Sequence, residues 1–239
     1  MNKTESIHLN EIAKHSLYSA GANSEMIKHS FVVASRYLVG GSILELGPAE
    51  GVMTSMLIST GKKLTLVEGS EIFCRQLQND FPDASVVHSL FEEFDPKEKK
   101  FDNIILGHVL EHVEDPINIL KIAKKWLTPK IGRLFAAVPN SRSLHRQAAV
   151  LMGLLPQEDS LNEMDRYHGH RRVFNPETFR NAFLQAGLKI DIFGGYWLKP
   201  VSNKQIEDSW TSEMLNAFMQ LGERYPDIAG EIYVVASNP

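Results

Sequence analysis

A carboxylate followed by a glycine-rich turn is the first feature of the sequence whose residue types point to chemistry. Glu45 lies near the end of a short apolar run, residues 42–46, and the turn that follows comprises Gly47, Pro48, Ala49 and Gly51. Glycine lets the backbone turn tightly and lets a ligand approach it closely. The helix expected next offers unpaired N–H groups at its N-terminus. An acidic residue beside such a turn opposes a pyrophosphate and favours a ligand that carries a cationic ammonium group.

A second carboxylate ends the next apolar run. Glu68 follows residues 63–67 and precedes Gly69 and Ser70. It stands about 20 residues beyond the glycine turn, where doubly wound folds place an acidic group on ribose hydroxyls. Either feature alone also fits an ordinary tight connection between a strand and a helix. Together they indicate a ligand with an amino-acid end and a nucleoside end.

Histidine and arginine form two further groups. His108 and His112 are four residues apart, so they share a face if the segment is helical. This is a spacing of metal ligands, but no second motif supplies the remaining ligands, and we predict no metal. His168 and His170 fall in a basic segment, residues 166–174, and are candidates, with His112, for the base that takes a proton from an acceptor. Basic or aromatic candidates for acceptor binding are Arg142, His145, Arg166, Tyr167, Arg171 and Arg172.

These basic residues fit two interpretations. Guanidinium groups pair bidentately with carboxylates and phosphates, so the segment is able to form a pocket for an anionic acceptor. The alternative is a solvated loop whose arginines pair with the neighbouring acids Glu163 and Asp165. Arg146, close to Arg142 and His145, adds one more basic group to the same stretch.

The elements that must position these residues alternate along the chain. Short β-branched and apolar runs predict strands, and the segments between them have helical spacing, an arrangement typical of parallel strands joined by right-handed crossovers. Asn175, Pro176 and Gly187 carry the start and stop signals of a helix. Strands are predicted over residues 42–46, 63–67, 84–88, 101–106, 132–138, 188–193 and 231–237, and helices over 5–38 with a break at 19–23, 50–60, 71–80, 116–127, 175–187 and 203–224.

This pattern predicts an α/β fold, a Rossmann-like, doubly wound and mostly parallel sheet of seven strands. The last two strands are able to form an antiparallel pair. We expect a single domain over residues 1–239. Its parts are an N-terminal helical lid (1–40), a cofactor-binding core (41–139), an insertion that caps the acceptor (140–175) and the C-terminal part of the sheet (176–239).

Residues from about 40 to 140 resemble a class I S-adenosylmethionine-dependent methyltransferase of the group that acts on small molecules. The family's first motif is an acid followed by three alternating glycines, and Ala49 replaces the middle one. The resemblance implies that Glu45 and the turn face the methionine end, and that Glu68 holds the ribose. The residues assigned to the cofactor are Glu45, Gly47, Pro48, Ala49, Gly51, Glu68, Gly69, Ser70, Ser89, Leu90, Phe91, Gly107 and His108.

The most specific local match lies after the fourth predicted strand, in residues 107–116, where Gly107 and His108 would lie beside the sulfonium. Two other enzyme classes fit less well. A nicotinamide site normally carries G-x-G-x-x-G, and here the last glycine comes one residue early. Methyltransferases of exocyclic or amide nitrogens share an Asn/Asp-Pro-Pro-aromatic motif, which the segment after Leu106 does not have.

Composition narrows the partners. The net charge of −4 argues against nucleic acid as the main partner. The single cysteine, Cys74, excludes an internal disulfide and fits a reducing compartment. No apolar run is long enough to span a bilayer, so we expect a soluble, cytoplasmic protein, a monomer or a homodimer, without a membrane partner.

The predicted function is methyl transfer from S-adenosyl-L-methionine to oxygen or nitrogen of a small molecule, or of a glycan, lipid or secondary-metabolite intermediate, that bears an anionic group. A cofactor-binding protein without catalysis and a nicotinamide-dependent oxidoreductase are the alternatives.

Overall fold

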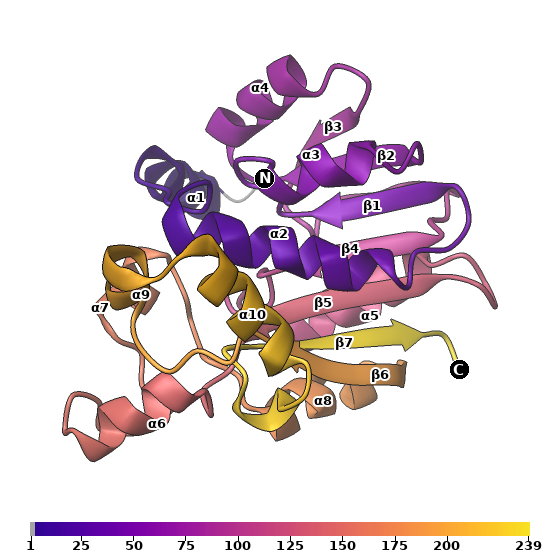
Figure 1. Cartoon of the computed structure of the whole chain (residues 1–239). Helices are drawn as coiled ribbons and strands as arrows, with labels where there is room; N and C mark the ends of the chain where they lie inside the picture. The colour runs from indigo at the N-terminus through magenta and orange to yellow at the C-terminus, as the bar shows by residue number, and fades with distance from the viewer. Residues whose placement is uncertain (1–2) are drawn as a thin grey trace.

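The computed structural model describes residues 3–239 and contains a sheet of seven strands with helices on both faces (Figure 1). The strands are β1 (Ser42–Leu46), β2 (Lys63–Glu68), β3 (Ser85–His88), β4 (Asn103–Gly107), β5 (Arg133–Pro139), β6 (Lys189–Tyr196) and β7 (Glu231–Ser237). Their order is β3-β2-β1-β4-β5-β7-β6. Strands β1 to β5 are parallel, and β7 lies antiparallel between β5 and β6. The predicted Rossmann-like α/β fold is confirmed.

The central strands are buried on both faces because helices cover both. Successive side chains of a strand point to opposite faces, so Leu44 and Leu46 of β1 join one core while Ile43 joins the other. Strand β4 divides in the same way, with Ile104 and Leu106 on one side and Ile105 on the other. This explains why these strands have continuous apolar sequences rather than alternating ones.

Two sets of helices complete the layers. Helices α5 (Pro116–Trp126) and α8 (Pro176–Gln185) pack on one face. The opposite face is covered by α2 (Gly21–Ser35), α3 (Val52–Ile58), α4 (Glu71–Asp80), α9 (Asn203–Ser209) and α10 (Ser212–Gly222). Helix α1 (Lys3–Lys14) contacts α4, near the ends of β1 and β2 (Figure 1). Cys74 is buried within α4.

Local capping signals account for the helix boundaries. The helix predicted from Asn175 is confirmed: Asn175 forms a capping box with Thr178, Pro176 opens α8, and Gly187 follows the C-cap with a φ of +74°. The single helix predicted over residues 203–224 is wrong. The structure divides it into α9 and α10, because Thr211 has extended backbone angles and its side chain caps the start of α10.

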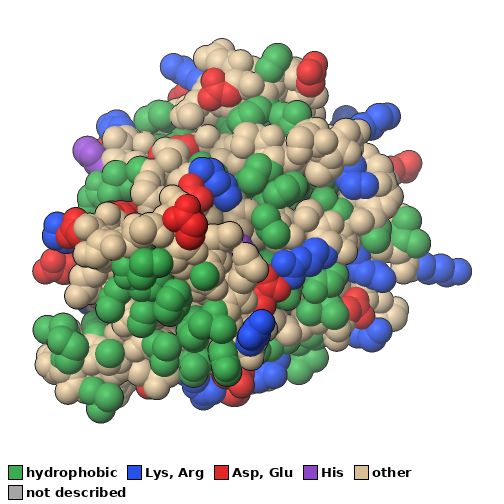
Figure 2. All heavy atoms as spheres, viewed as in Figure 1, with side chains coloured by type: hydrophobic (Ala, Val, Ile, Leu, Met, Phe, Trp, Pro, Cys, Tyr) green, Lys and Arg blue, Asp and Glu red, His purple; other side chains and the backbone are tan. Residues whose placement is uncertain are grey.

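The segment between β5 and α8 carries two short helices, α6 (Leu144–Leu151) and α7 (Glu163–Tyr167), and α6 projects from the body of the molecule (Figure 1). Three large apolar side chains at its C-terminal end are exposed: Leu151, the last residue of the helix, and Met152 and Leu154 after it. Hydrophobic side chains gather on the same side of the molecule in the space-filling view (Figure 2). Within residues 3–239, no helix combines the length and the apolar character needed to cross a membrane.

The side chain of Asn103 ties the chain before β1 to β4. Its amide nitrogen donates to the carbonyls of Val39 and Ser42, at 2.7 and 2.9 Å, and its amide oxygen accepts from the N–H of Val39 at 2.8 Å. Replacing Asn103 by Ala leaves these backbone groups without their partner in a buried position. We expect the free energy of unfolding to fall by about 2–4 kcal/mol in urea denaturation. The exposed Asn79→Ala is the control, and equal losses in both variants would contradict this role.

Candidate functional site

The turn between β1 and α3 is built from residues with left-handed backbone angles. Gly47, Ala49 and Gly51 have φ values of +66°, +49° and +77°. A Cβ on Gly51 would lie 2.5 Å from Cε2 of Phe81, so a side chain at this position would force the Phe81 ring to move. Ala49 adopts the same type of conformation at a cost of roughly 1–2 kcal/mol. The alanine in place of the middle glycine therefore keeps the shape of the turn and adds strain at the site.

Glu45 is a buried carboxylate beside this turn. It is 3% exposed, and its Oε2 accepts a hydrogen bond of 2.7 Å from Oγ1 of Thr54 in α3. Burial raises the pKa of Glu45 to about 7, and the like charge of Glu68 on the neighbouring strand adds to the increase. Glu45 lines a small recess with Gly47, Pro48, Ala49, Gly107 and His108. A cationic group in this recess would stabilise the ionised carboxylate.

Glu68 ends β2 and faces the same turn. Its Oε2 accepts from the N–H of Ala49 at 3.2 Å, and its Oε1 accepts from the N–H of Ser70 at 2.8 Å. Burial raises the pKa of Glu68, although these backbone donors act in the opposite direction. The parallel register of β1 and β2 brings the two carboxylates to one edge of the sheet, since it pairs Leu46 with Val67.

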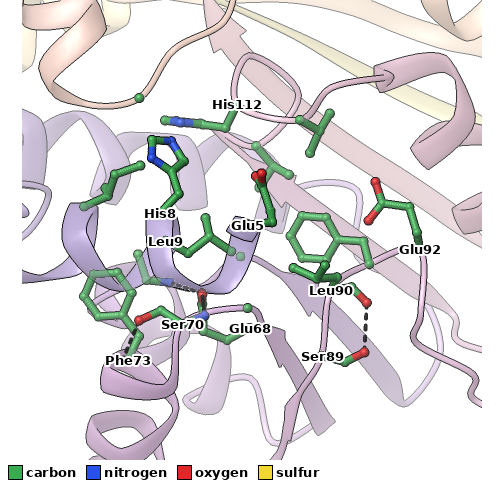
Figure 3. Close-up of a pocket in the computed structure, with 18 of the residues that line it drawn as sticks. Glu5, His8, Leu9, Glu68, Ser70, Phe73, Ser89, Leu90, Glu92 and His112 are labelled. Carbon is green, nitrogen blue, oxygen red and sulfur yellow. Dashed lines mark hydrogen bonds between the residues drawn. The ribbon is translucent and has the colours of Figure 1, made fainter. Parts of the chain in front are cut away.

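A cavity of about 400 Å³ opens from this edge. Its floor contains the strand ends and the loops after them, and α1 supplies the opposite wall (Figure 3). Asn10 of α1 contacts the floor, with its Oδ1 accepting a hydrogen bond of 2.8 Å from Oγ of Ser70. Of the cofactor residues predicted from the sequence, Gly51 is the N-cap of α3 and is not among the described residues that line the cavity or the recess. The others line one or both of these spaces: Glu45, Gly47, Pro48, Ala49, Glu68, Gly69, Ser70, Ser89, Leu90, Phe91, Gly107 and His108.

His108 lies between the recess and the cavity with an unusual backbone. Its φ is +59°, and its side chain is buried. Nε2 is 3.2 Å from Oη of Tyr196, and Nδ1 is 3.6 Å from a carboxylate oxygen of Glu111 and of Glu231. Burial acts to lower the pKa of His108, but the two carboxylates outweigh it and raise the pKa. His108 is therefore held by buried groups behind the cleft.

The expectation that His108 and His112 share a helical face is wrong. Residues 108–115 form turns, and α5 begins only at Pro116, with Asp115 as its N-cap. His112 lines the cavity, and its Nε2 is 3.2 Å from Oη of Tyr18. Burial lowers the pKa of His112 to about 4. Instead of pairing with His108, His112 lies with Glu111 and His170, and one ligand-capable atom of each is within 4.8 Å of the others.

The other two histidines predicted as bases lie behind His112. The ring of His170 is 4.7 Å from that of His112 and nearly perpendicular to it. The ring of His168 is 5.2 Å from that of Tyr18. Of these three histidines, only His112 is among the described residues that line the cavity. Its side chain reaches the cavity wall in Figure 3.

The basic residues predicted to bind the acceptor are not gathered into one pocket. Arg142 pairs with Glu177, Tyr167 donates to the carbonyl of His15, and Arg166 is exposed. Arg171 pairs with Glu5 and donates to the carbonyl of His112, whereas Arg172 donates to the carbonyls of Leu110, Val113 and Glu114. The imidazole of His145 is largely buried, and burial lowers its pKa. None of these six is among the described residues that line the cavity.

Several lining residues were not predicted. Glu5, His8, Leu9 and Ile12 of α1 enter the wall, and Phe73 of α4 enters the floor. Glu50 lines the recess, and its Oε2 is buried without a hydrogen-bond partner among residues 3–239. Glu50 lies within the glycine turn, between Ala49 and Gly51, and this position in the sequence would have identified it as a candidate. The α1 residues carry no local signal, because only the packing of α1 against α4 brings them to the cavity.

Comparison with known proteins agrees with this geometry. A family model described as a methyltransferase domain matches residues 28–191. The chain is 25% identical over 177 residues to the ubiquinone biosynthesis O-methyltransferase of Actinobacillus pleuropneumoniae, covering 70% of this chain and 74% of the relative. It is 23% identical over 181 residues to the enzyme of that name from Hydrogenovibrio crunogenus, covering 73% of each.

Solved structures share the fold at lower identity. A possible histamine N-methyltransferase from Thermotoga maritima aligns over 100% of this chain and 96% of its own, with a TM-score of 0.63 and 15% identity. The magnesium protoporphyrin IX methyltransferase of Synechocystis, solved with bound SAH, aligns over 100% of both chains with a TM-score of 0.63 and 13% identity. Since the family model spans more than half of the sequence, the chain belongs to the methyltransferase domain family, as a class I S-adenosylmethionine-dependent enzyme.

Proposed function

We propose that the cleft binds S-adenosyl-L-methionine with its methionine end in the recess beside Glu45 and its adenosine end in the larger cavity. The observation that carries this proposal is the pair of buried carboxylates, Glu45 and Glu68, on either side of a left-handed glycine turn. Glu45 would face the ammonium group. Glu68 would hold the ribose hydroxyls, and Leu90 and Phe91 would contact the adenine.

We further propose that the acceptor is a hydroxyl of a small molecule, placed beside His112 and Tyr18. Both curated relatives are O-methyltransferases by name. The acceptor oxygen would give its proton to water and form a bond to the methyl carbon. The C–S bond would break, and its electrons would return to sulfur. Positioning alone contributes roughly 7–11 kcal/mol in favourable cases.

The lining of the cavity favours an acceptor with a largely apolar body. Leu9, Ile12, Val109 and Val113 are part of its wall. The anionic acceptor predicted from the sequence finds less support, because Arg142, Arg171 and Arg172 bind acidic side chains or backbone carbonyls. We retain a small molecule as the acceptor, because the cavity is a cleft of about 400 Å³ rather than an extended surface.

Two measurements test the function directly. Calorimetry should show binding of S-adenosylmethionine and S-adenosylhomocysteine but not of NAD. An isotopically labelled methyl group should pass from the cofactor to hydroxylated acceptors in a metabolite extract. Binding without any transfer would favour a non-catalytic protein, and binding of NAD alone would favour an oxidoreductase.

Removing one acceptor oxygen of Glu68 should weaken cofactor binding. In Glu68→Gln the amide keeps the shape of the side chain, but its NH2 group cannot accept, so the variant loses a charge-assisted hydrogen bond to the ribose and one from the N–H of Ala49 or Ser70. Such a loss corresponds to roughly 10- to 100-fold in Kd. The control is Glu71→Gln, an exposed acid in the first turn of α4 that pairs with Arg75. Calorimetric Kd values that change equally in both variants would argue against a ribose contact.

Cofactor binding should release a proton from Glu45. Its pKa of about 7 keeps most of the carboxyl protonated at about pH 6.5, where an α-ammonium group is already charged. The incoming cation lowers that pKa, so a proton leaves to the buffer, and the release disappears above about pH 8. Calorimetry in buffers of different ionisation enthalpy measures this quantity. Release of the same size in Glu45→Gln would assign the proton to another group.

A further inference from the structure

Glu111 is a buried carboxylate. Its residue is 1% exposed, and neither Oε1 nor Oε2 has a hydrogen-bond partner among the residues that the structure describes. Nδ1 of His108 is 3.6 Å from Oε1, which is beyond hydrogen-bond length. His108 forms an ion pair with Glu111 at this distance, but both carboxylate oxygens still lack a hydrogen bond within residues 3–239, so Glu111 is able to accept a further cationic partner.

The neighbours of Glu111 supply a suitable set of donors. One ligand-capable atom from each of Glu111, His112 and His170 lies within 4.8 Å of the other two. Two imidazoles and one carboxylate bind divalent first-row transition metals on one side and leave the remaining coordination positions open. The three residues come from two segments far apart in the sequence, and only the tertiary fold brings them together.

The outer contacts of His170 match those of a metal-binding imidazole. Its Nδ1 is 3.4 Å from Oδ1 of Asp165, so we assign Nε2 to the cation. Metal-binding histidines commonly direct their second ring nitrogen to a carboxylate. Asp165 is itself fixed, because its Oδ2 accepts from the N–H of Asn162 at 2.9 Å and from Nη1 of Arg146 at 3.0 Å.

Arg171 joins the two segments, and a backbone hydrogen bond fixes His170 within its own segment. The N–H of Arg171 donates to the carbonyl of Glu111 at 2.9 Å, and Nε of Arg171 donates to the carbonyl of His112 at 2.7 Å. The N–H of His170 donates to the carbonyl of Asp165 at 2.8 Å. The donor atoms are thus held at short range before any ion binds, which lowers the cost of assembling a site.

We propose that Glu111, His112 and His170 bind one divalent first-row transition-metal ion, with an open coordination position on the cavity side of His112. The ion would take the acceptor's hydroxyl oxygen, a role that rests on the proposed function. Coordination lowers the pKa of the hydroxyl, its proton passes to water, and the oxygen then attacks the methyl group. Binding of the ion by itself is independent of that function.

Cobalt(II) is the probe, because its visible absorption reports coordination by nitrogen and oxygen. The full-length chain, treated with a chelator and then dialysed, should bind one equivalent of Co²⁺ in a spectrophotometric titration, and elemental analysis should find one equivalent of Zn²⁺ after reconstitution. Glu111→Gln and His170→Asn should each weaken binding by at least roughly 10-fold. His168→Asn is the matched control, since it lies on the same loop outside the three ligands, and it should bind like the parent.

Calorimetry with S-adenosylmethionine checks that each variant is folded and separates the two proposals. We expect its Kd to be the same in the parent and in both ligand variants. Failure of Co²⁺ to bind the parent, or equal binding in all variants, would overturn the metal site. If Co²⁺ binds as expected while S-adenosylmethionine does not bind, the proposed function fails and the metal site stands.

Azide tests the open position. It should shift the absorption of the bound cobalt, because a small anion entering from the cavity completes the coordination shell. An unchanged spectrum at saturating azide would overturn the assignment of the acceptor oxygen to the ion.

Discussion

Buried negative charge along one edge of the sheet is the constraint on which the site depends. Glu45, Glu68 and Glu111 lie at or just beyond the ends of adjacent parallel strands, each nearly removed from water. Removing a carboxylate from water is costly unless cations or N–H donors compensate it. Backbone N–H groups donate to Glu68, and one hydroxyl donates to Glu45, whereas within residues 3–239 no hydrogen-bond donor reaches Glu111. The cleft is therefore suited to ligands that bring positive charge.

The arginines of the basic segment after α7 bind other parts of the same chain. Arg171 and Arg172 donate to backbone carbonyls of the loop after β4, and Arg171 also pairs with Glu5 of α1. These contacts connect the segment between β5 and α8, the loop after β4 and the N-terminal helix. Their guanidinium groups hold these segments together, whereas His168 and His170, which precede them, lie beside Tyr18 and Glu111 respectively.

Helix α1 gives the cavity a wall that lies outside the part of the chain matched by the family model. The match begins at residue 28, whereas α1 ends at Lys14. Leu9 packs against Gly69, and Ile12 packs against Gly169, so one short helix lines the cavity from the loop after β2 to the loop after α7.

The sequence by itself determined the features that depend on local chemistry. The apolar strands, the glycine turn with its two carboxylates and the capped helix at Pro176 were all predicted, because short-range sterics and hydrogen bonds govern them. Tertiary structure decided the rest. The left-handed turn at His108 separates it from His112, and long-range packing brings His170 to Glu111 and turns the arginines toward carbonyls. Contacts between segments so distant along the chain leave no periodicity or spacing in the sequence, so only the folded chain reveals them.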